Sequence, residues 1–208
     1  MDDQSDSYKT VTREKAHETG VKGSRFIAHI FPASSENDIE KILHELKAKY
    51  HDATHHCYAY IISIEGNRIS RYYDDGEPSG TAGKPILTVL EGNGLVNVIC
   101  IVVRYFGGTK LGIGGLSRAY SDAAREVLNN CKIENRIITG EVEFEFPYSI
   151  TGTVEKLISD YNAEIGSRDF GEETKVICNI RKSRIPDFIA QFNDMTRGQG
   201  KIKQTETN

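Results

Sequence analysis

The segment Val96–Phe106, with the sequence VNVICIVVRYF, constrains the fold more than any other part of the chain. Its apolar residues run together without alternating with polar ones, and many of them are β-branched. This pattern indicates a strand that is buried on both faces of a sheet. The segment therefore predicts a central strand covered on both sides, and 208 residues are enough to build such a core without disulfides or metals.

Several other elements are expected around this strand within residues 1–136. Ser35 is followed three residues later by Asp38, which is a variant of the capping box at a helix start. The tripeptide Glu65-Gly66-Asn67 indicates a hairpin turn. The expected elements are a strand in 22–31, a helix from Ser35 to about Tyr50, hairpin strands in 57–64 and 68–73, a brief helix in 86–91, and a helix from Leu116 to about Asn130.

Residues 137–208 have a simpler pattern. Val142, Phe144 and Phe146 alternate with three glutamates, which predicts a strand with one buried face and one charged face in solvent. Ser183 is the expected cap of the last helix. The remaining expected elements are a helix in 150–161, a strand in 165–170, a strand around 176–180, a helix in 185–195 and a strand in 200–205.

The order of these elements, β-α-β-β-α-β, is that of a ferredoxin-like fold. The polar stretch CKIENR, residues 131–136, separates them from the earlier elements. We therefore predict an α+β protein with two domains, residues 1–136 and 137–208.

Composition excludes several classes of protein. The net charge of −4 is not the polybasic kind that holds nucleic acid by charge alone, so any contact with RNA has to be local. The four cysteines form no C-x-x-C pair and are expected to be buried free thiols in a reducing cytosol. The acidic N-terminus is unlike a signal peptide, and the longest apolar run, Val98–Val103, is too short to span a membrane. A cytoplasmic protein without a membrane partner is predicted.

The stretch Arg71–Leu87, RYYDDGEPSGTAGKPIL, gathers three carboxylates before a run of small residues. Its carboxylates lack the alternating spacing of a calcium loop. Its Gly83-Lys84 pair is not part of a phosphate-binding P-loop, because prolines replace the first glycine and the hydroxyl residue. The remaining interpretation is that the carboxylates accept backbone N–H groups and order the loop.

A second glycine-rich stretch, Gly107–Gly115, follows the central strand and precedes a helix. In this order, backbone N–H groups and a helix N-terminus can hold an anion. Lys110 and Arg118 supply charge nearby, and Thr109 and Ser117 supply hydroxyls. The alternative is a connection that needs glycine only for its backbone conformation.

Histidines occur at positions 51, 55 and 56, next to Cys57, but no second pair of His or Cys completes a zinc site. One of His55 and His56 is expected to face the loop, with a hydrogen bond to Asp74 or Glu77. There is no G-x-S-x-G elbow for a serine nucleophile. We therefore predict no metal, no cofactor and no catalytic residue.

Four motifs follow one another along the chain: KGSRFIA, ATHHCYAY, DDGEPSGTAGKPIL and VVRYFGGTKLGIGGLSRAY. In this combination they closely resemble the IMPACT family of proteins, and specifically its bacterial YigZ branch, over about residues 8–130. The resemblance implies a first domain like domain two of a small-subunit ribosomal protein, followed by a ferredoxin-like domain. It also implies a link to translation, because eukaryotic relatives regulate translation.

The resemblance implies that the two glycine-rich stretches together form one functional surface. Its expected role is non-catalytic binding of RNA, the ribosome or a translation-regulatory protein. The alternative is an enzyme or sensor for a small phosphorylated ligand, with a phosphate-like anion at the glycine loops. The predicted site residues are His55, Asp74, Asp75, Glu77, Thr81, Lys84, Arg104, Gly107, Gly108, Thr109, Lys110, Gly112, Gly114, Gly115, Ser117 and Arg118.

Overall fold

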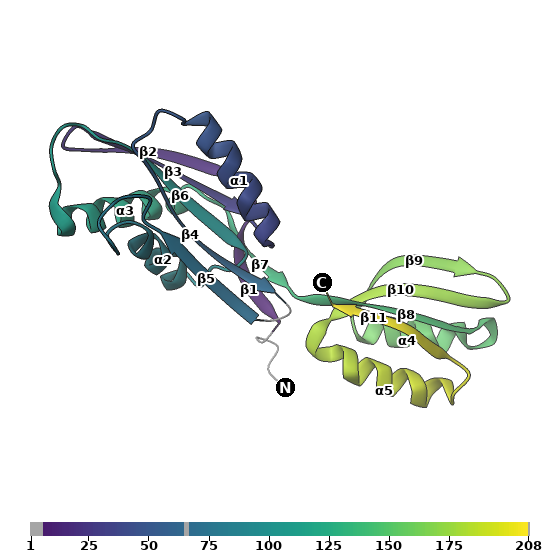
Figure 1. Cartoon of the computed structure of the whole chain (residues 1–208). Coiled ribbons are helices and arrows are strands. Elements are labelled where there is room, and N and C mark those ends of the chain that lie inside the picture. Colours follow the sequence, from purple (N-terminus) through teal and green to yellow (C-terminus); the bar gives the residue numbers. More distant parts are fainter. Residues whose placement is uncertain (1–5, 65–66, 208) are drawn as a thin grey trace. The chain divides into compact units, whose positions relative to one another are not determined.

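The structure is a computed structural model that describes residues 6–64 and 67–207. Its contacts divide the chain into two units (Figure 1). The N-terminal unit is Tyr8–Arg136. The C-terminal unit contains residues 137–207 together with Asp6 and Ser7, so the chain's first described residues belong with its last ones. Both units combine helices with antiparallel sheets, which confirms the α+β class.

The N-terminal unit is built on a five-stranded sheet in the order β2-β3-β6-β4-β5. Its strands are β2 (Lys15–Val21), β3 (Ser24–Pro32), β4 (His55–Ile64), β5 (Asn67–Tyr73) and β6 (Val98–Tyr105). All neighbouring strands are antiparallel. The middle strand, β6, is buried from Val98 to Arg104, which confirms the predicted central strand. The predicted hairpin of β4 and β5 is also confirmed, although residues 65 and 66 of its turn lie outside the described residues.

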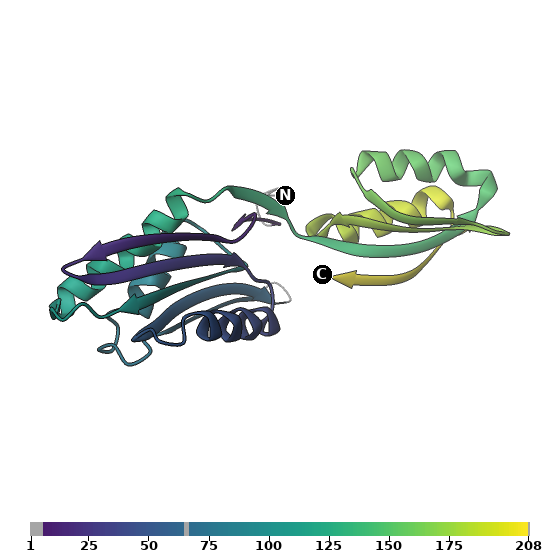
Figure 2. The same ribbon diagram turned by 90° about the horizontal axis from the view of Figure 1, so that it is seen from above.

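Helices cover both faces of this sheet (Figure 2). On one face lie α2 (Gly83–Gly92) and α3 (Gly112–Asn129), and on the other lies α1 (Glu36–Lys49). The alternation of β6 sends Val98, Cys100 and Val102 into the core beneath α2 and α3. Its other residues, Ile99, Ile101 and Val103, enter the smaller core beneath α1. The predicted capping box of α1 is present, with Ser35 and Asp38 bonded reciprocally.

Three strands of the described chain were not predicted from the sequence. These are β1 (Ser7–Val11), β2, and β7 (Ile133–Ile137). The stretch 131–136 was expected to be a linker, but most of it is β7, which pairs with β1 in a two-stranded sheet. The physical reason is that backbone hydrogen bonds build this pairing, and four of the five residues of β7 are exposed. Its composition therefore carries no apolar signal.

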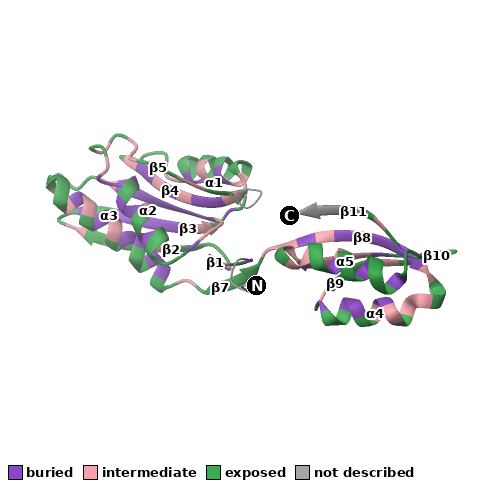
Figure 3. Ribbon diagram, turned by 90° about the horizontal axis from the view of Figure 1, so that it is seen from below, coloured by how far each residue is buried: buried purple, intermediate pink, exposed green. Residues whose placement is uncertain are grey.

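The C-terminal unit has the predicted β-α-β-β-α-β order. Its sheet has the strand order β11-β8-β10-β9, and α4 and α5 lie on one face of it (Figure 1). The buried residues alternate along β10, and along β8 they alternate up to Phe144, after which Glu145 and Phe146 are also buried (Figure 3). The elements are β8 (Thr139–Pro147), α4 (Thr151–Asp160), β9 (Glu164–Phe170), β10 (Glu173–Arg181), α5 (Ile185–Thr196) and β11 (Lys201–Thr207).

Two details of this unit differ from the prediction. Ser183 does not cap α5 with its side chain; instead its backbone N–H donates to the Asp6 carboxylate at 2.7 Å. Glu145 is not in solvent, because its side chain is 8% exposed and lies 2.6 Å from the Lys203 ammonium. Among the helices of the described ranges, none has the length and apolar character needed to cross a membrane.

Candidate binding pocket between the glycine-rich loops

The loop that follows β5 is held in place by the Asp74 carboxylate. Its two oxygens accept backbone N–H bonds from Gly80 at 2.8 Å, Ala82 at 3.0 Å and Gly83 at 2.8 Å. Gly83 is required for close approach, because a Cβ there would lie 2.7 Å from the backbone nitrogen of Tyr73. The loop is therefore locked onto the end of β5 and the start of α2, as the carboxylate-ordered interpretation predicted.

Asp75 orients His55 in the neighbouring strand. The Asp75 backbone is in the left-handed region, with φ +45°, and its carboxylate accepts the His56 backbone N–H at 2.6 Å. Its carbonyl oxygen lies 2.7 Å from His55 Nδ1. This contact turns the other ring nitrogen, Nε2, toward Glu77, whose Oε1 is 3.8 Å away. His55 thus faces the loop as expected, but its hydrogen bond is to the Asp75 carbonyl and not to Asp74 or Glu77.

Glu77 and Arg104 form a buried ion pair, and each side chain is only 5% exposed. The same Glu77 oxygen accepts the Tyr120 hydroxyl at 2.8 Å. Arg104 also donates to Ser24 Oγ at 3.3 Å, and its guanidinium lies 5.3 Å from the centre of the Phe26 ring. The expectation that Arg104 offers a surface cation is therefore wrong, because its charge is already neutralised inside the unit.

Burial also decides the protonation of the groups around this ion pair. It raises the pKa of the Cys57 thiol and of the Tyr120 hydroxyl. Cys57 Sγ lies 2.9 Å from the Asp74 carbonyl and 3.3 Å from the Tyr120 oxygen. Both groups therefore stay protonated near neutral pH and act as hydrogen-bond partners in the interior.

The second glycine-rich stretch divides into two parts with different roles. Gly107 belongs to the sheet end, where a Cβ would lie 1.9 Å from the carbonyl carbon of Gly23, so only glycine fits. The helix α3 begins at Gly112, four residues before the expected Leu116, so Gly112, Gly114 and Gly115 belong to its first turn. No side chain caps this end of α3. Its first N–H groups have no helical acceptor by geometry.

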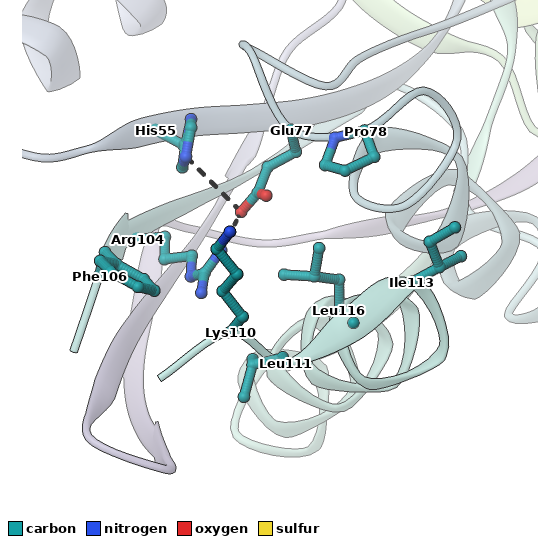
Figure 4. Close-up of a pocket in the computed structure, with 10 residues that line it drawn as sticks. His55, Glu77, Pro78, Arg104, Phe106, Lys110, Leu111, Ile113 and Leu116 are labelled. Atoms are coloured by element: carbon teal, nitrogen blue, oxygen red, sulfur yellow. Dashed lines mark hydrogen bonds and ion pairs between the residues drawn. The ribbon is translucent and has the colours of Figure 1, made fainter. Parts of the chain in front are cut away.

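The two stretches meet at a pocket of about 410 Å³ (Figure 4). His55, Glu77 and Arg104 lie together in it, and the dashed lines in Figure 4 join Glu77 to the other two. Phe106 is 47% exposed and Ile113 is 70% exposed. The complete lining is His55, Glu77, Pro78, Arg104, Phe106, Lys110, Leu111, Gly112, Ile113 and Leu116.

Five predicted site residues line this pocket, namely His55, Glu77, Arg104, Lys110 and Gly112. Gly115 and Arg118 line a second pocket of about 200 Å³, together with Lys22. Leu111 lines both pockets, so they are neighbours. Lys110 and Arg118, expected to act together, are thus on different pockets. The predicted residues that line neither pocket are Asp74, Asp75, Thr81, Lys84, Gly107, Gly108, Thr109, Gly114 and Ser117.

These nine residues divide by burial and contact. Thr81 is buried and donates to the Pro78 carbonyl at 2.6 Å, so it shapes the loop. Lys84 and Thr109 are exposed, and Ser117 is half-buried on α3. The sequence reasoning missed the apolar lining, above all Phe106, Leu111 and Ile113. The sequence did contain a signal for this lining. Apolar residues within a glycine-rich loop are not needed for the buried face of a strand or helix, so they can line a pocket.

Among the described residues, no group of three or more His, Cys, Asp or Glu side chains is placed to hold a metal ion. Three polar groups of the pocket, His55, Glu77 and Arg104, instead contact one another or the loop. The arrangement offers a ligand hydrogen-bond acceptors at one end, apolar walls, and a helix N-terminus beside an exposed lysine.

Comparison with known proteins follows the division into two units. A family model described as "Impact N-terminal domain" matches residues 22–128, and one described as "Domain of unknown function (DUF1949)" matches residues 144–199. "IMPACT family member YvyE" of Bacillus subtilis is 34% identical over 200 residues, which is 96% of this chain and 92% of that protein. "IMPACT family member YigZ" of Escherichia coli is 29% identical over 86% of this chain and 88% of its own length.

A solved structure also resembles the whole chain. It is described as "Crystal structure of an hypothetical protein", and it is 27% identical with a TM-score of 0.68. The likeness covers 95% of this chain and 96% of that one. Both units of the fold therefore recur together in a solved structure.

Proposed function

The chain belongs to the IMPACT family, and from that premise we propose that it is a non-catalytic protein that regulates translation by binding RNA through the pocket between its glycine-rich loops. The observation that carries the proposal is the division of charge in this pocket. Glu77 and Arg104 are bonded to each other, whereas Lys110 is exposed and has no partner among the described residues. The cation left for a partner thus lies beside the uncapped start of α3.

The surroundings of Lys110 support an RNA partner. Phe106 presents about half of its surface, and aromatic side chains of this kind stack on unpaired bases. Lys22 and Arg118 continue the positive charge onto the neighbouring pocket. Phosphates attract such a local group of cations even on a chain whose net charge is negative.

The test is the binding of single-stranded RNA by the parent chain and by Lys110→Glu at several salt concentrations. We expect weaker binding and a shallower salt dependence for the variant, because a phosphate contact has been lost. Lys84→Glu is the matched control: it makes the same charge change on an exposed lysine of α2 that lines neither pocket. Equal binding by all three proteins, or no RNA binding by the parent, contradicts the proposal. A protein partner captured through the same pocket would replace RNA in it.

A second candidate function is an enzyme or sensor for a small phosphorylated ligand. The observation in its favour is the volume of about 410 Å³, within the range of about 300–1,000 Å³ that is usual for small-molecule sites. If the chain binds a nucleoside monophosphate saturably and does not bind RNA, this second candidate is supported and the RNA function is not.

A further inference from the structure

We infer that the pocket holds a single nucleotide unit, with an unpaired base bearing an amino group inside it and the phosphate at the N-terminus of α3. The inference rests on the proposed function in that it names what the pocket recognises, but a free nucleotide could satisfy it without RNA. The evidence comes from the two ends of the pocket and from the walls between them.

The inner end presents hydrogen-bond acceptors. The Asp75 carbonyl can only accept, so His55 Nδ1, 2.7 Å away, carries the proton of the bond between them. The other ring nitrogen, Nε2, lies beside the Glu77 carboxylate, whose oxygens accept hydrogen bonds. Both groups line the pocket. A ligand group with N–H donors, such as an exocyclic amino group, fits this end.

The same end also contains one unused donor. Arg104 is 4% exposed and lines the pocket, yet its Nε has no hydrogen-bond partner among the described residues. A buried donor without a partner is rare, because it loses its bonds to water. A donor beside the Glu77 carboxylate matches the edge of adenine or cytosine, where an amino group adjoins a ring nitrogen that accepts.

The walls between the ends are apolar and suit a flat ring. Pro78, Leu111 and Leu116 line the pocket, and Phe106 lies at the same site with half of its surface exposed (Figure 4). The Arg104 guanidinium lies 5.5 Å from the centre of the Phe106 ring. A base between these side chains loses water from both faces, which is the usual source of stacking affinity.

The outer end suits a phosphate. The first turn of α3 has no side-chain cap, and Lys110 lies two residues before the helix begins. A Cβ on Gly112 or Gly114 would meet no other atom within 4 Å, so the backbone is open to a ligand here. Helix N-terminal N–H groups bind phosphates in many proteins. The positive end of the helix and the lysine therefore select the same group.

Two sources could supply this nucleotide, a free mononucleotide or an unpaired position in a single strand. The neighbouring pocket favours the strand, because Lys22 and Arg118 lie across Leu111 from the phosphate end. The next phosphate of a strand can meet these cations. A mononucleotide cannot reach beyond its own phosphate and leaves them unused.

The experiment measures the affinity of the full chain for pairs of 5′-monophosphates that differ by one amino group. The pairs are AMP with purine ribonucleoside 5′-monophosphate, and CMP with 2-pyrimidinone ribonucleoside 5′-monophosphate. We expect the amino compound of at least one pair to bind about tenfold more tightly, as expected for a hydrogen bond to a charged group. Equal binding within both pairs, or no saturable binding of any of the four, overturns the inference.

Two variants test which group of the nucleotide lies at each end of the pocket. His55→Asn retains an N–H near the Nδ1 position, so the bond to Asp75 can persist, but it lacks Nε2, the ring nitrogen that lies beside Glu77 at the inner end. We expect it to reduce the preference within the pair to near onefold. Lys110→Glu should weaken both nucleotides equally while leaving the corresponding nucleosides unaffected. The lysine is on the surface, so this second comparison remains decisive if the histidine variant does not fold. If Lys110→Glu weakens nucleosides and nucleotides alike, the phosphate assignment is wrong.

A third comparison separates the two sources and the two proposals. Lys22→Glu combined with Arg118→Glu should weaken binding of a hexanucleotide of the preferred base but not of its monophosphate. If monophosphates discriminate and no RNA binds, the nucleotide pocket stands and the RNA function falls. If RNA binds through Lys110 without discrimination within either pair, the RNA function stands and this inference falls.

Discussion

In the N-terminal unit the ion pair of Glu77 and Arg104 lies buried beneath the pocket, whereas in the C-terminal unit Glu145 bonds to Lys203 at the surface of a sheet. The first pair has both side chains 5% exposed. In the second, the Glu145 side chain is 8% exposed, but the Lys203 side chain is 46% exposed, so only one of the two charges is removed from water. Removing two charges from water is unfavourable unless they are well paired. The stability of the N-terminal unit therefore depends on the pairing of Glu77 with Arg104, and the C-terminal unit has no such requirement at Glu145 and Lys203.

The difference indicates where function lies. The C-terminal unit needs only an alternating pattern and two amphipathic helices to close its core. The N-terminal unit brings Glu77, Arg104 and Tyr120 together from a loop, a strand and a helix. This network fixes the pocket lining before any ligand arrives, which reduces the ordering that binding requires. We therefore associate recognition with the N-terminal unit.

The largest effect is expected when the buried pair is broken. Glu77→Ala leaves Arg104 buried without its partner, which is expected to lower the stability of the N-terminal unit by about 3–5 kcal/mol. Glu145→Ala is the matched change in the C-terminal unit; it leaves a lysine that is already in contact with water, so it should lower the stability of that unit much less. Calorimetric unfolding of the full chain measures both. Equal shifts for the two variants would show that the two ion pairs are not different in kind.

The second comparison uses pH, because all histidines of the chain lie in residues 1–136. Burial lowers the pKa of His29 from 6.5 to about 4, with Lys49 as a smaller cause. The folded unit therefore resists protonation of this ring, and its contribution to stability is full above pH 6.5. It is lost as the pH falls from 6.5 through about 4, by about 3 kcal/mol in total.

His29→Gln should reduce this pH dependence in the N-terminal unit and leave the C-terminal unit unaffected. The measurement is thermal unfolding of the full chain between pH 7 and pH 4. His44→Gln is the control, because His44 is exposed on α1. If His29→Gln leaves the pH dependence as steep as in the parent, the ring is not the group responsible.

The third prediction concerns the independence of the C-terminal unit. We propose that residues 137–208 fold on their own, because their core is closed by their own side chains. Asp6 adds two bonds from the other end of the chain: its carboxylate accepts the Ser183 N–H, and its backbone carbonyl accepts the Ile138 N–H. Asp6→Ala removes the first of these and should therefore lower the stability of this unit by about 1.5–3 kcal/mol, as expected for a hydrogen bond to a charged group.

Asp122→Ala provides the control for this change, because Asp122 is half-exposed and its one ion pair among the described residues is with Arg125 on α3. Unfolding followed by hydrogen exchange resolves the two units. An isolated 137–208 fragment without a cooperative transition would refute the proposed independence. A fragment as stable as the same unit in the full chain would show that Asp6 contributes nothing.

The sequence predicted the elements that bury apolar residues in a regular pattern. The alternation of apolar and charged residues predicted β8, and the uninterrupted run of apolar residues predicted β6 as a central strand. It did not predict β2 or β7, because these strands keep most of their residues exposed and are held by backbone bonds. Strand propensity does not reveal such pairing, because the pairing depends on strands that are far apart in the chain.

Five of the predicted site residues line one pocket, but the contacts of the predicted residues were inferred unevenly from the sequence. Asp74 was recognised as a loop-ordering carboxylate because such bonds are local. Arg104 was assigned to the surface, since its partner Glu77 is 27 residues away and nothing in the sequence links them. The start of α3 was placed too late, because the four residues GIGG have a low helix propensity.

The smallest predicted effect on stability follows from the low helix propensity of glycine. Gly114 in α3 and Gly152 in α4 both lie in a helical first turn, without a positive φ, and a Cβ on either would meet nothing within 4 Å. Nothing within either unit requires glycine at these positions. Replacement by alanine should therefore stabilise each unit by up to about 1 kcal/mol, because alanine loses less backbone freedom on folding.

The two variants should differ only in binding. At the open end of α3 the added methyl group lies where a phosphate would approach the backbone, so Gly114→Ala should bind RNA and nucleotides more weakly than the parent. Gly152→Ala should bind them equally well, because it changes the unit that lacks the pocket. Parallel melting and binding measurements test both statements. If Gly114→Ala becomes more stable and keeps its full affinity, the glycine-rich start of α3 is not a ligand site, and the division of roles between the two units has to be abandoned.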